Sequence, residues 1–226
     1  MAGLVRHRRD PSHQTVSMEV TIPDGLRLAV VDDEGGEDWL DALPAFVERA
    51  VERWDLALDE PFATGMAAWT APATTRSGDE VVVKISYPHL EARDEGAALR
   101  VWHGAGAVEV LDSDPDDWAL LLRRLRPGST LRDAHLPAAE HLTVGASLMH
   151  RTAMVPVDGT ASFRALCDVT RELAAVMEER RDRLLDTAPI RFDAGLCRYA
   201  VDLMRSLPLD APRAGLAHGD LNPGNI

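Results

Sequence analysis

The segment HGDLNPGN, from His218 to Asn225, concentrates polar and turn-forming residues whose side chains can do chemistry. A carboxylate and an amide five residues apart, in a loop rich in glycine and proline, can bring two oxygen atoms to one point. Asp220 is placed to accept a proton from a substrate hydroxyl. Asn225 offers a carbonyl oxygen to Mg²⁺, a cation that prefers oxygen ligands. The alternative is a surface loop with an Asx-turn at residues 222–224, which leaves the preceding His-Gly-Asp unexplained.

A second candidate is Lys84, which follows three valines and is predicted to lie in a central β-strand. Most lysines face solvent, whereas a lysine that points into a cleft is a point charge for phosphate. The helix expected after this strand carries Glu91 and Glu95, which lie four residues apart and therefore on one face. Either carboxylate can pair with Lys84 and hold it in place.

Hydrophobic periodicity predicts the elements that position these residues. The apolar stripe over residues 38–56 predicts a helix with Asp38 as its N-cap, and Pro44 is expected to kink or divide it. An antiparallel hairpin is expected around a turn at residues 77–79, and its second strand carries Lys84. A helix, two strands joined by an acidic turn, and three amphipathic helices follow, at residues 89–102, 106–112, 118–125, 138–154, 162–185 and 191–207.

The order of these elements divides the chain into two parts. A β-rich first half and a helical second half meet at a connector, where Pro127 and Gly128 break the sheet pattern. We therefore predict an α+β fold with two lobes. Residues 1–17 are polar, basic and without periodicity, and are expected to be a disordered N-terminal extension. The apolar stripes of the three later helices are expected to belong to the core.

The formal net charge of −13 bounds the possible partners. It argues against nucleic acid, because binding to a phosphate backbone needs clustered lysine and arginine. It is compatible with a cationic small-molecule substrate, although solubility alone also explains an acidic surface. Apolar runs are too short to span a membrane, and the N-terminus has no signal-peptide core. Cys167 and Cys197 suit free thiols in a reducing cytoplasm. The sequence indicates no oligomeric state.

The segment around His218 resembles the catalytic loop of the aminoglycoside phosphotransferases, a branch of the protein-kinase-like fold. That branch has His-Gly-Asp followed after four residues by Asn, where protein kinases have His-Arg-Asp. The run VVVKI is similar to the kinase lysine motif, and the order of the elements matches as well. The segments DEGAALRVWHGAGAVEVL and LLLRRLRPGSTL look closer still to the streptomycin 6-kinase and hydroxyurea phosphotransferase subfamily. The resemblance covers roughly residues 60–226.

The resemblance implies a role for each residue of the loop. Asp220 would be the catalytic base, Asn225 would bind one Mg²⁺, and His218 would brace the loop. It also implies that residues 18–126 are the nucleotide-binding N-lobe. Residues 127–226 would then be a partial helical C-lobe that ends in the catalytic loop.

The same resemblance implies how ATP would be held. Lys84 would bind the α- and β-phosphates and pair with Glu95, with Glu91 as the weaker candidate. The backbone around Arg124 and Leu125 would form the hinge that takes the adenine. Phosphoryl transfer needs mostly positioning and charge neutralisation, so these few residues can suffice.

Two features depart from the family pattern. No G-x-G-x-x-G precedes Lys84, where only Gly65 is available. The sequence also ends at Ile226, before the strand that would supply a second metal-binding aspartate. We therefore expect the catalytic loop to be the middle of an enzyme, and the chain to be a fragment or a truncated product.

The leading interpretation is an ATP- and Mg²⁺-dependent O-phosphotransferase, an antibiotic-resistance kinase. Its acceptor would be a small, hydroxylated and cationic molecule such as streptomycin. A kinase of hydroxyurea, or of a sugar or amino sugar, is the alternative within the same class. The alternative from another class is a catalytically inactive, truncated remnant that binds nucleotide.

Overall fold

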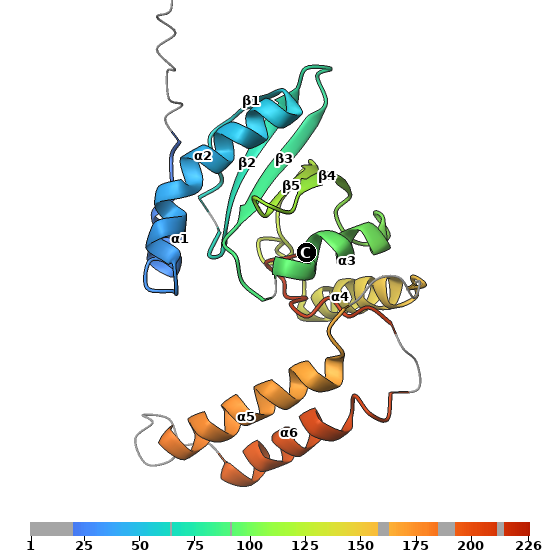
Figure 1. Ribbon diagram of the computed structural model, residues 1–226. Helices are drawn as coiled ribbons and strands as arrows, with labels where there is room; N and C mark the ends of the chain where they lie inside the picture. The colour runs from blue at the N-terminus through green and yellow to red at the C-terminus, as the bar shows by residue number, and fades with distance from the viewer. Residues whose placement is uncertain (1–19, 64, 91, 158–162, 185–192, 212–214) are drawn as a thin grey trace, which may run out of the picture. The chain divides into compact units, whose positions relative to one another are not determined.

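The computed structural model describes residues 20–63, 65–90, 92–157, 163–184, 193–211 and 215–226. The extension predicted at residues 1–17 lies outside them. The chain forms two compact units (Figure 1). The first unit contains the described residues up to His89 together with Asp112–Leu122, and the second contains Leu90–Leu111 together with Arg123–Ile226. The division into lobes at residue 127, expected from the sequence, stays a prediction.

The strands form one five-stranded sheet in the order β1-β2-β3-β5-β4. β1 pairs antiparallel with β2, and β2 with β3, in a register that sets Thr70 opposite Lys84. The predicted hairpin and the central position of the strand that carries Lys84 are therefore confirmed, as is the α+β fold class. The strands are β1 (Leu56–Leu58), β2 (Ala68–Thr75), β3 (Glu80–Ser86), β4 (Val110–Asp114) and β5 (Ala119–Arg123).

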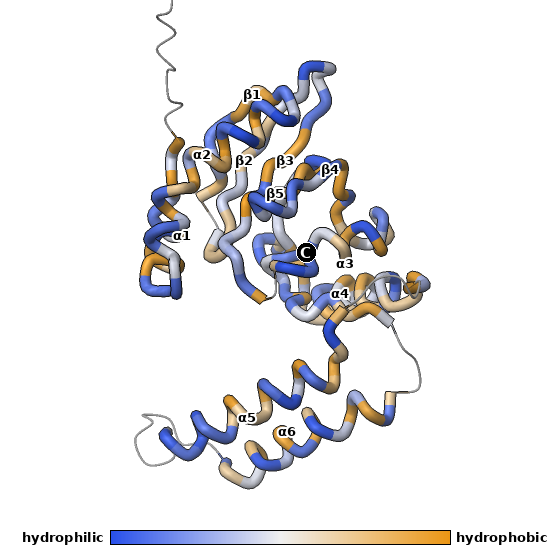
Figure 2. The backbone as a smooth tube through the Cα atoms, viewed as in Figure 1, coloured by the Kyte–Doolittle hydropathy of each residue, from blue (hydrophilic) through white to orange (hydrophobic). Residues whose placement is uncertain are grey.

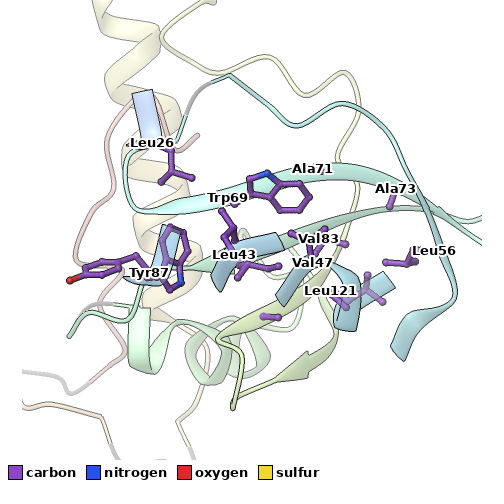
Figure 3. Close-up of a cluster of buried hydrophobic side chains, with 14 of the residues drawn as sticks. Leu26, Leu43, Val47, Leu56, Trp69, Ala71, Ala73, Val83, Tyr87 and Leu121 are labelled. Atoms are coloured by element: carbon purple, nitrogen blue, oxygen red, sulfur yellow. The ribbon is translucent and has the colours of Figure 1, made fainter. Parts of the chain in front are cut away.

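From Glu80 to Ile85, the side chains of strand β3 alternate between buried and more exposed positions. Val81, Val83 and Ile85 have no exposed surface and belong to the core of the first unit, whereas Val82 and Lys84 are half-buried. Because successive side chains of a strand point to opposite faces, Lys84 lies on the face opposite the core. Figure 3 shows the core cluster, in which side chains of the helices, the hairpin and β5 meet.

Helix α2 (Gly36–Trp54) covers the core face of the sheet, after the shorter helix α1 (Asp24–Val30), which the sequence did not predict. The N-cap of α2 is Gly35, so the prediction of Asp38 as N-cap was wrong. Asp38 lies in the first turn instead, where a carboxylate complements the helix dipole. The helix also continues through Pro44 without dividing, because its apolar face stays buried on both sides of the proline, at Trp39, Leu40, Leu43, Val47 and Ala50.

Hydrogen bonds and ion pairs connect helix α2 to the acidic turn between β4 and β5. Arg49 makes two hydrogen bonds of 2.6 Å to the carboxylate of Asp117, and this pairing raises the pKa of Arg49. Arg53 donates to Asp114 at 3.1 Å, and the Trp54 indole donates to a nearby carboxylate, that of Asp112, at 2.8 Å. Several of the acidic residues of this turn therefore have structural partners within the first unit.

The second unit contains a short helix, α3 (Glu95–Trp102), which follows a 3₁₀ turn (Ala92–Asp94). The helix predicted at residues 89–102 is thus shorter than expected and begins at Glu95. Glu91 lies outside the described residues. β4 begins at Val110, later than predicted, because residues 103–107 form turns with two glycines at positive φ. In the described part of the chain, no helix is both long and apolar enough to cross a membrane.

Three helices follow in the second unit, close to where the sequence predicts them: α4 (Ala138–Ala153), α5 (Leu166–Leu184) and α6 (Ala194–Ser206). α5 and α6 lie side by side (Figure 1). The Arg205 guanidinium forms a bidentate ion pair with the Glu178 carboxylate.

The prediction that the apolar stripes of these helices belong to the core was wrong at several positions. Leu142 is 74% exposed and Leu196 68% exposed, and Tyr199 is also exposed. Hydrophobic residues recur along α5 and α6 (Figure 2), but only some, such as Ala174 and Val201, are buried. A periodic stripe shows which face of a helix can be buried, whereas burial itself depends on the elements that pack there.

Helix α6 has a strong N-cap that offers a test of its stability. The carboxylate of Asp193 accepts the backbone N–H groups of Gly195 and Leu196 at 2.7 and 3.1 Å, and these hydrogen bonds lower its pKa. We expect Asp193→Ala to lower the melting temperature. Asp193→Asn should lower it much less, because the amide oxygen also accepts hydrogen bonds from the helix N–H groups. Equal melting temperatures for the alanine variant and the wild type would contradict this assignment.

The same cap predicts a pH dependence. Because the pKa of Asp193 is lowered on folding, its stabilisation is present above the ordinary carboxylate pKa. It is lost as the pH falls through the lowered pKa. Melting curves between neutral and acidic pH should therefore show a smaller loss of stability for Asp193→Ala than for the wild type.

Candidate functional site

The loop from His218 to Ile226 brings the carboxylate of Asp220 and the amide of Asn225 into direct contact. The Asn225 Nδ2 donates to Asp220 Oδ2 at 2.8 Å and to the Asp220 carbonyl oxygen at 2.9 Å. The other carboxylate oxygen, Oδ1, accepts from Asn222 Nδ2 at 2.8 Å. Asp220 is exposed, so its carboxylate is held in place and remains accessible.

A turn centred on Asn222 closes this loop. The Asn222 Oδ1 accepts the N–H of Gly224 at 2.8 Å, and the Asn222 carbonyl oxygen accepts the N–H of Asn225 at 2.9 Å. This is the Asx-turn that the sequence offered as an alternative to a site. The turn and the site are the same feature, because the turn returns Asn225 to Asp220.

The expected meeting of two oxygen atoms does not occur, because Asn225 turns its nitrogen to Asp220 and both Asp220 oxygens accept hydrogen bonds from amides. The atom that fits Mg²⁺ is the amide oxygen of Asn225. With its nitrogen directed to Asp220, the amide of Asn225 leaves an oxygen that accepts no hydrogen bond from the described residues. No group of three or more His, Cys, Asp or Glu side chains that could hold a metal occurs in the described parts of the chain. The Asn225 oxygen can nevertheless contribute to such a site, because Mg²⁺ keeps several waters and is bound by few protein oxygens together with substrate phosphates.

His218 begins the loop and lies against helix α3. Its Nδ1 is 3.4 Å from the backbone nitrogen of Asp220, which donates to it. The imidazole stacks on the indole of Trp102, with ring centroids 5.6 Å apart and ring planes 9° apart. Gly219, between His218 and Asp220, has a φ of 80°, which a residue with a side chain rarely adopts.

The other end of the loop is held by the segment that follows the Pro127-Gly128 connector. The backbone N–H of Leu131 donates to the Ile226 carbonyl oxygen at 2.5 Å, and that of Arg132 to the Pro223 carbonyl oxygen at 2.8 Å. The Arg132 guanidinium also fills the space beside Gly224, where a Cβ atom would lie 2.7 Å from its terminal nitrogen.

This close approach gives a prediction for Gly224→Ala. The new methyl group must displace the Arg132 guanidinium and also crowds Asn222 Oδ1, which is 3.1 Å away. We expect the free energy of unfolding, measured with denaturant, to fall by about 1 kcal/mol. Because the crowding comes mainly from Arg132, adding Arg132→Ala should restore most of that loss. A double variant as unstable as the sum of the single variants would place the strain elsewhere.

Lys84 and Glu95 belong to different units, so their predicted ion pair stays a prediction. Lys84 is half-buried in the central strand of the sheet, on the face opposite the core. Glu95 is half-buried at the first position of α3, where the helix dipole stabilises a carboxylate. The composition also distinguishes Lys84, although the sequence patterns did not use this. Lys84 is the only lysine in the chain, and the other strongly basic residues are all arginine.

The predicted hinge residues follow directly after β5. One of the three points at which the chain passes between the two units lies here, between Leu122 and Arg123. Arg123 makes a 2.6 Å ion pair with Glu109, which lowers the pKa of that carboxyl. Arg124 is half-buried, and Leu125 is 60% exposed. An exposed leucine next to extended backbone is compatible with the predicted adenine site, which stays a prediction.

The comparison with protein families agrees with the motif and the geometry of the loop. The model of the aminoglycoside/hydroxyurea antibiotic resistance kinases matches residues 53–226, which include the hairpin, α3 and the whole loop. The chain belongs to this kinase family. The resemblance predicted from the loop and the strand lysine is therefore confirmed.

Three curated relatives share similar identity with this member of the family. A streptomycin 6-kinase of Streptomyces glaucescens is 33% identical over 92% of this chain and 66% of its own length. A streptomycin 6-kinase of Streptomyces griseus is 31% identical over 93% and 66%, respectively. A hydroxyurea phosphotransferase of Kitasatospora aureofaciens is 33% identical over 84% and 54%. The chain thus spans slightly less than two thirds of the two streptomycin 6-kinases and about half of the hydroxyurea phosphotransferase.

Three residues that support the kinase loop were missed as site residues by the sequence patterns. Asn222 was predicted only as part of a turn, although its side-chain amide also donates a hydrogen bond to the Asp220 carboxylate. Trp102 was predicted only to lie in the helix at residues 89–102, and Arg132 was assigned no role. Both meet the loop only through tertiary contacts, so sequence spacing could not reveal them.

Proposed function

We propose that the protein that contains this chain transfers the γ-phosphoryl group of ATP to a hydroxyl group of a small molecule. The acceptor oxygen forms a bond to the γ-phosphorus, the bond between this phosphorus and the bridging oxygen breaks, and ADP leaves. Asp220 orients the acceptor hydroxyl and takes its proton. His218 braces the loop. The protein supplies mainly position and charge, as expected for phosphoryl transfer.

The single observation that carries this proposal is the contact between Asp220 and Asn225. Each oxygen of the Asp220 carboxylate accepts a hydrogen bond from one side-chain amide, that of Asn222 or Asn225, and Asp220 remains exposed. A proton acceptor must be both fixed in place and reachable by its substrate. Mg²⁺, if bound by Asn225 and the phosphates of ATP, would neutralise the phosphate charge.

Lys84 is proposed to bind the α- and β-phosphates of ATP, with Glu95 as its partner. Its being the only lysine supports this role. An ammonium is a compact, strongly hydrated point charge that a planar guanidinium does not reproduce, which would explain one lysine among so many arginines. Arg124 and Leu125 are proposed as the hinge that receives the adenine.

The acceptor is proposed to be a cationic aminocyclitol such as streptomycin. Two of the relatives are named for streptomycin, and the net charge of −13 favours a cation over the uncharged hydroxyurea. Hydroxyurea remains the second candidate, because one relative with the same identity is named for it. We also propose that the reaction takes place in the cytoplasm.

The test is a phosphoryl-transfer assay with the full-length protein, ATP labelled at the γ-phosphate, and Mg²⁺. Streptomycin, hydroxyurea, a neutral sugar and an amino sugar are compared as acceptors. We expect transfer to streptomycin, and transfer only to another acceptor would replace the substrate while keeping the reaction. Nucleotide binding without transfer to any acceptor would favour the inactive remnant, and the absence of both would overturn the proposal.

A further inference from the structure

Trp102 occupies an unusual place for a tryptophan at the end of a short helix. It is the last residue of α3 and is only 4% exposed. The face of its indole is stacked on the imidazole of His218, with ring centroids 5.6 Å apart and ring planes nearly parallel. Separations of about 4.5–7 Å are typical of attractive aromatic pairs. The contact joins α3 to the first residue of the candidate catalytic loop.

The stack reaches Asp220 through one further contact. The other feature that fixes the His218 ring is its Nδ1, which accepts the backbone N–H of Asp220. At 3.4 Å this hydrogen bond is long and therefore weak. The orientation of the imidazole therefore depends mainly on the indole face. Asn222 and Asn225 hold the Asp220 carboxylate itself, whereas the imidazole supports the backbone where the loop begins.

The indole N–H does not take part in this arrangement. The Trp102 Nε1 is buried and has no hydrogen-bond acceptor among the described residues. A buried indole N–H usually finds a partner. The ring therefore acts through its aromatic face, and another aromatic side chain at this position should preserve the function.

We propose that Trp102 is a positioning residue for phosphoryl transfer, which acts by stacking on His218 and thereby supports the backbone of the loop that carries Asp220. This inference rests on the proposed function. Helix α3 begins at Glu95, the proposed partner of Lys84, and ends at Trp102. The first residue of this eight-residue helix is thus the proposed partner of the phosphate-binding lysine. Its last residue contacts the candidate catalytic loop.

The first test compares Trp102→Leu with Trp102→Phe in the full-length protein. Loss of the stack should lower kcat by ~10²-fold, the effect expected when a reacting group is misplaced by about 1 Å. The KM for ATP should stay within about twofold of the wild-type value, because no phosphate contact is removed. Trp102→Phe should retain most of kcat. Equal kcat values for Trp102→Leu and the wild type would overturn the proposal.

Trp39→Leu is the matched control. Trp39 is also buried, at 6% exposed, and also contacts an aromatic ring, that of Tyr87, but it belongs to the core of the first unit. Its replacement should lower the melting temperature without lowering kcat of the folded protein. A kcat loss as large as that of Trp102→Leu would show that any core defect has this effect.

A double-mutant cycle keeps the proposal testable if Trp102→Leu does not fold. His218→Asn removes the stacked ring while keeping an acceptor for the Asp220 N–H. Trp102→Met, which also removes the aromatic face but keeps a long apolar side chain, should then lower kcat less in the His218→Asn background than in the wild type. Strictly additive effects would overturn the proposal.

Hydrogen exchange separates failure of this inference from failure of the proposed function. The amides of Asp220, Asn222, Gly224 and Asn225 all donate within the loop. They should exchange faster in Trp102→Leu or Trp102→Met than in Trp39→Leu, whether or not any acceptor is phosphorylated. Unchanged exchange in an active enzyme refutes only the role of Trp102. If the loop amides exchange faster in the variant but the wild type transfers no phosphoryl group, Trp102 still supports the loop and only the proposed reaction is refuted.

Discussion

Replacing Asp220 with asparagine is expected to lower the rate of phosphoryl transfer by ~10³-fold, within the range that a positioned general base contributes. The amide keeps the size of the side chain and an oxygen that can accept from Asn222 or Asn225. It cannot take the proton of the acceptor hydroxyl. Binding of ATP should be little changed, because the proposed phosphate contacts are made by Lys84. Single-turnover transfer assays and equilibrium binding of a labelled nucleotide measure the two effects separately.

Asp210→Asn is the matched control for this substitution. Asp210 is also an exposed aspartate of the second unit, and it lies outside the loop. The control should transfer phosphate at the wild-type rate. If Asp220→Asn is as active as this control, then Asp220 is not the base, and the proposed reaction loses the observation that carries it.

Replacing Lys84 with methionine is expected to lower kcat/KM for ATP by ~10²-fold, the size of one lost charge-assisted contact to phosphate. Methionine keeps an apolar stem in the half-buried site, so the melting temperature should change little. Lys84→Arg should recover little of the loss, because a guanidinium does not reproduce the compact ammonium. Full activity of the arginine variant would show that any positive charge serves at this position.

A chemical experiment tests the same position without a mutation. Because the chain contains no other lysine, an amine-reactive ester followed by peptide mass spectrometry reports on Lys84 alone among its lysine side chains. ATP with Mg²⁺ should slow this modification severalfold, while streptomycin alone should not. Equal modification with and without ATP would place the nucleotide away from Lys84.

Local sequence was sufficient where the contacts are themselves local. The pairing of Asp220 with Asn225 could be predicted because both residues lie in one short loop, whose Asx-turn at Asn222 is encoded by its own turn residues. The central strand of Lys84 was likewise predictable, because three adjacent valines and a turn at residues 77–79 favour a hairpin. The family followed from these two motifs and their order.

Features that depend on packing could not be predicted in the same way. Helix α2 begins earlier than expected and passes through Pro44, because burial of its apolar face outweighs the missing hydrogen bond. The stripes of α4 and α6 leave Leu142 and Leu196 exposed, since periodicity identifies an apolar face but not the element that covers it.

The support of the candidate site also depends on tertiary contacts. Trp102 stacks on His218, and the Arg132 guanidinium fills the space left by Gly224, although both partners are distant in sequence. The sequence by itself determined which residues can do the chemistry, because their types and short spacing set the loop. Only the tertiary structure decided which side chains hold that loop in place, because residues far apart in the chain become neighbours only through packing of the whole unit.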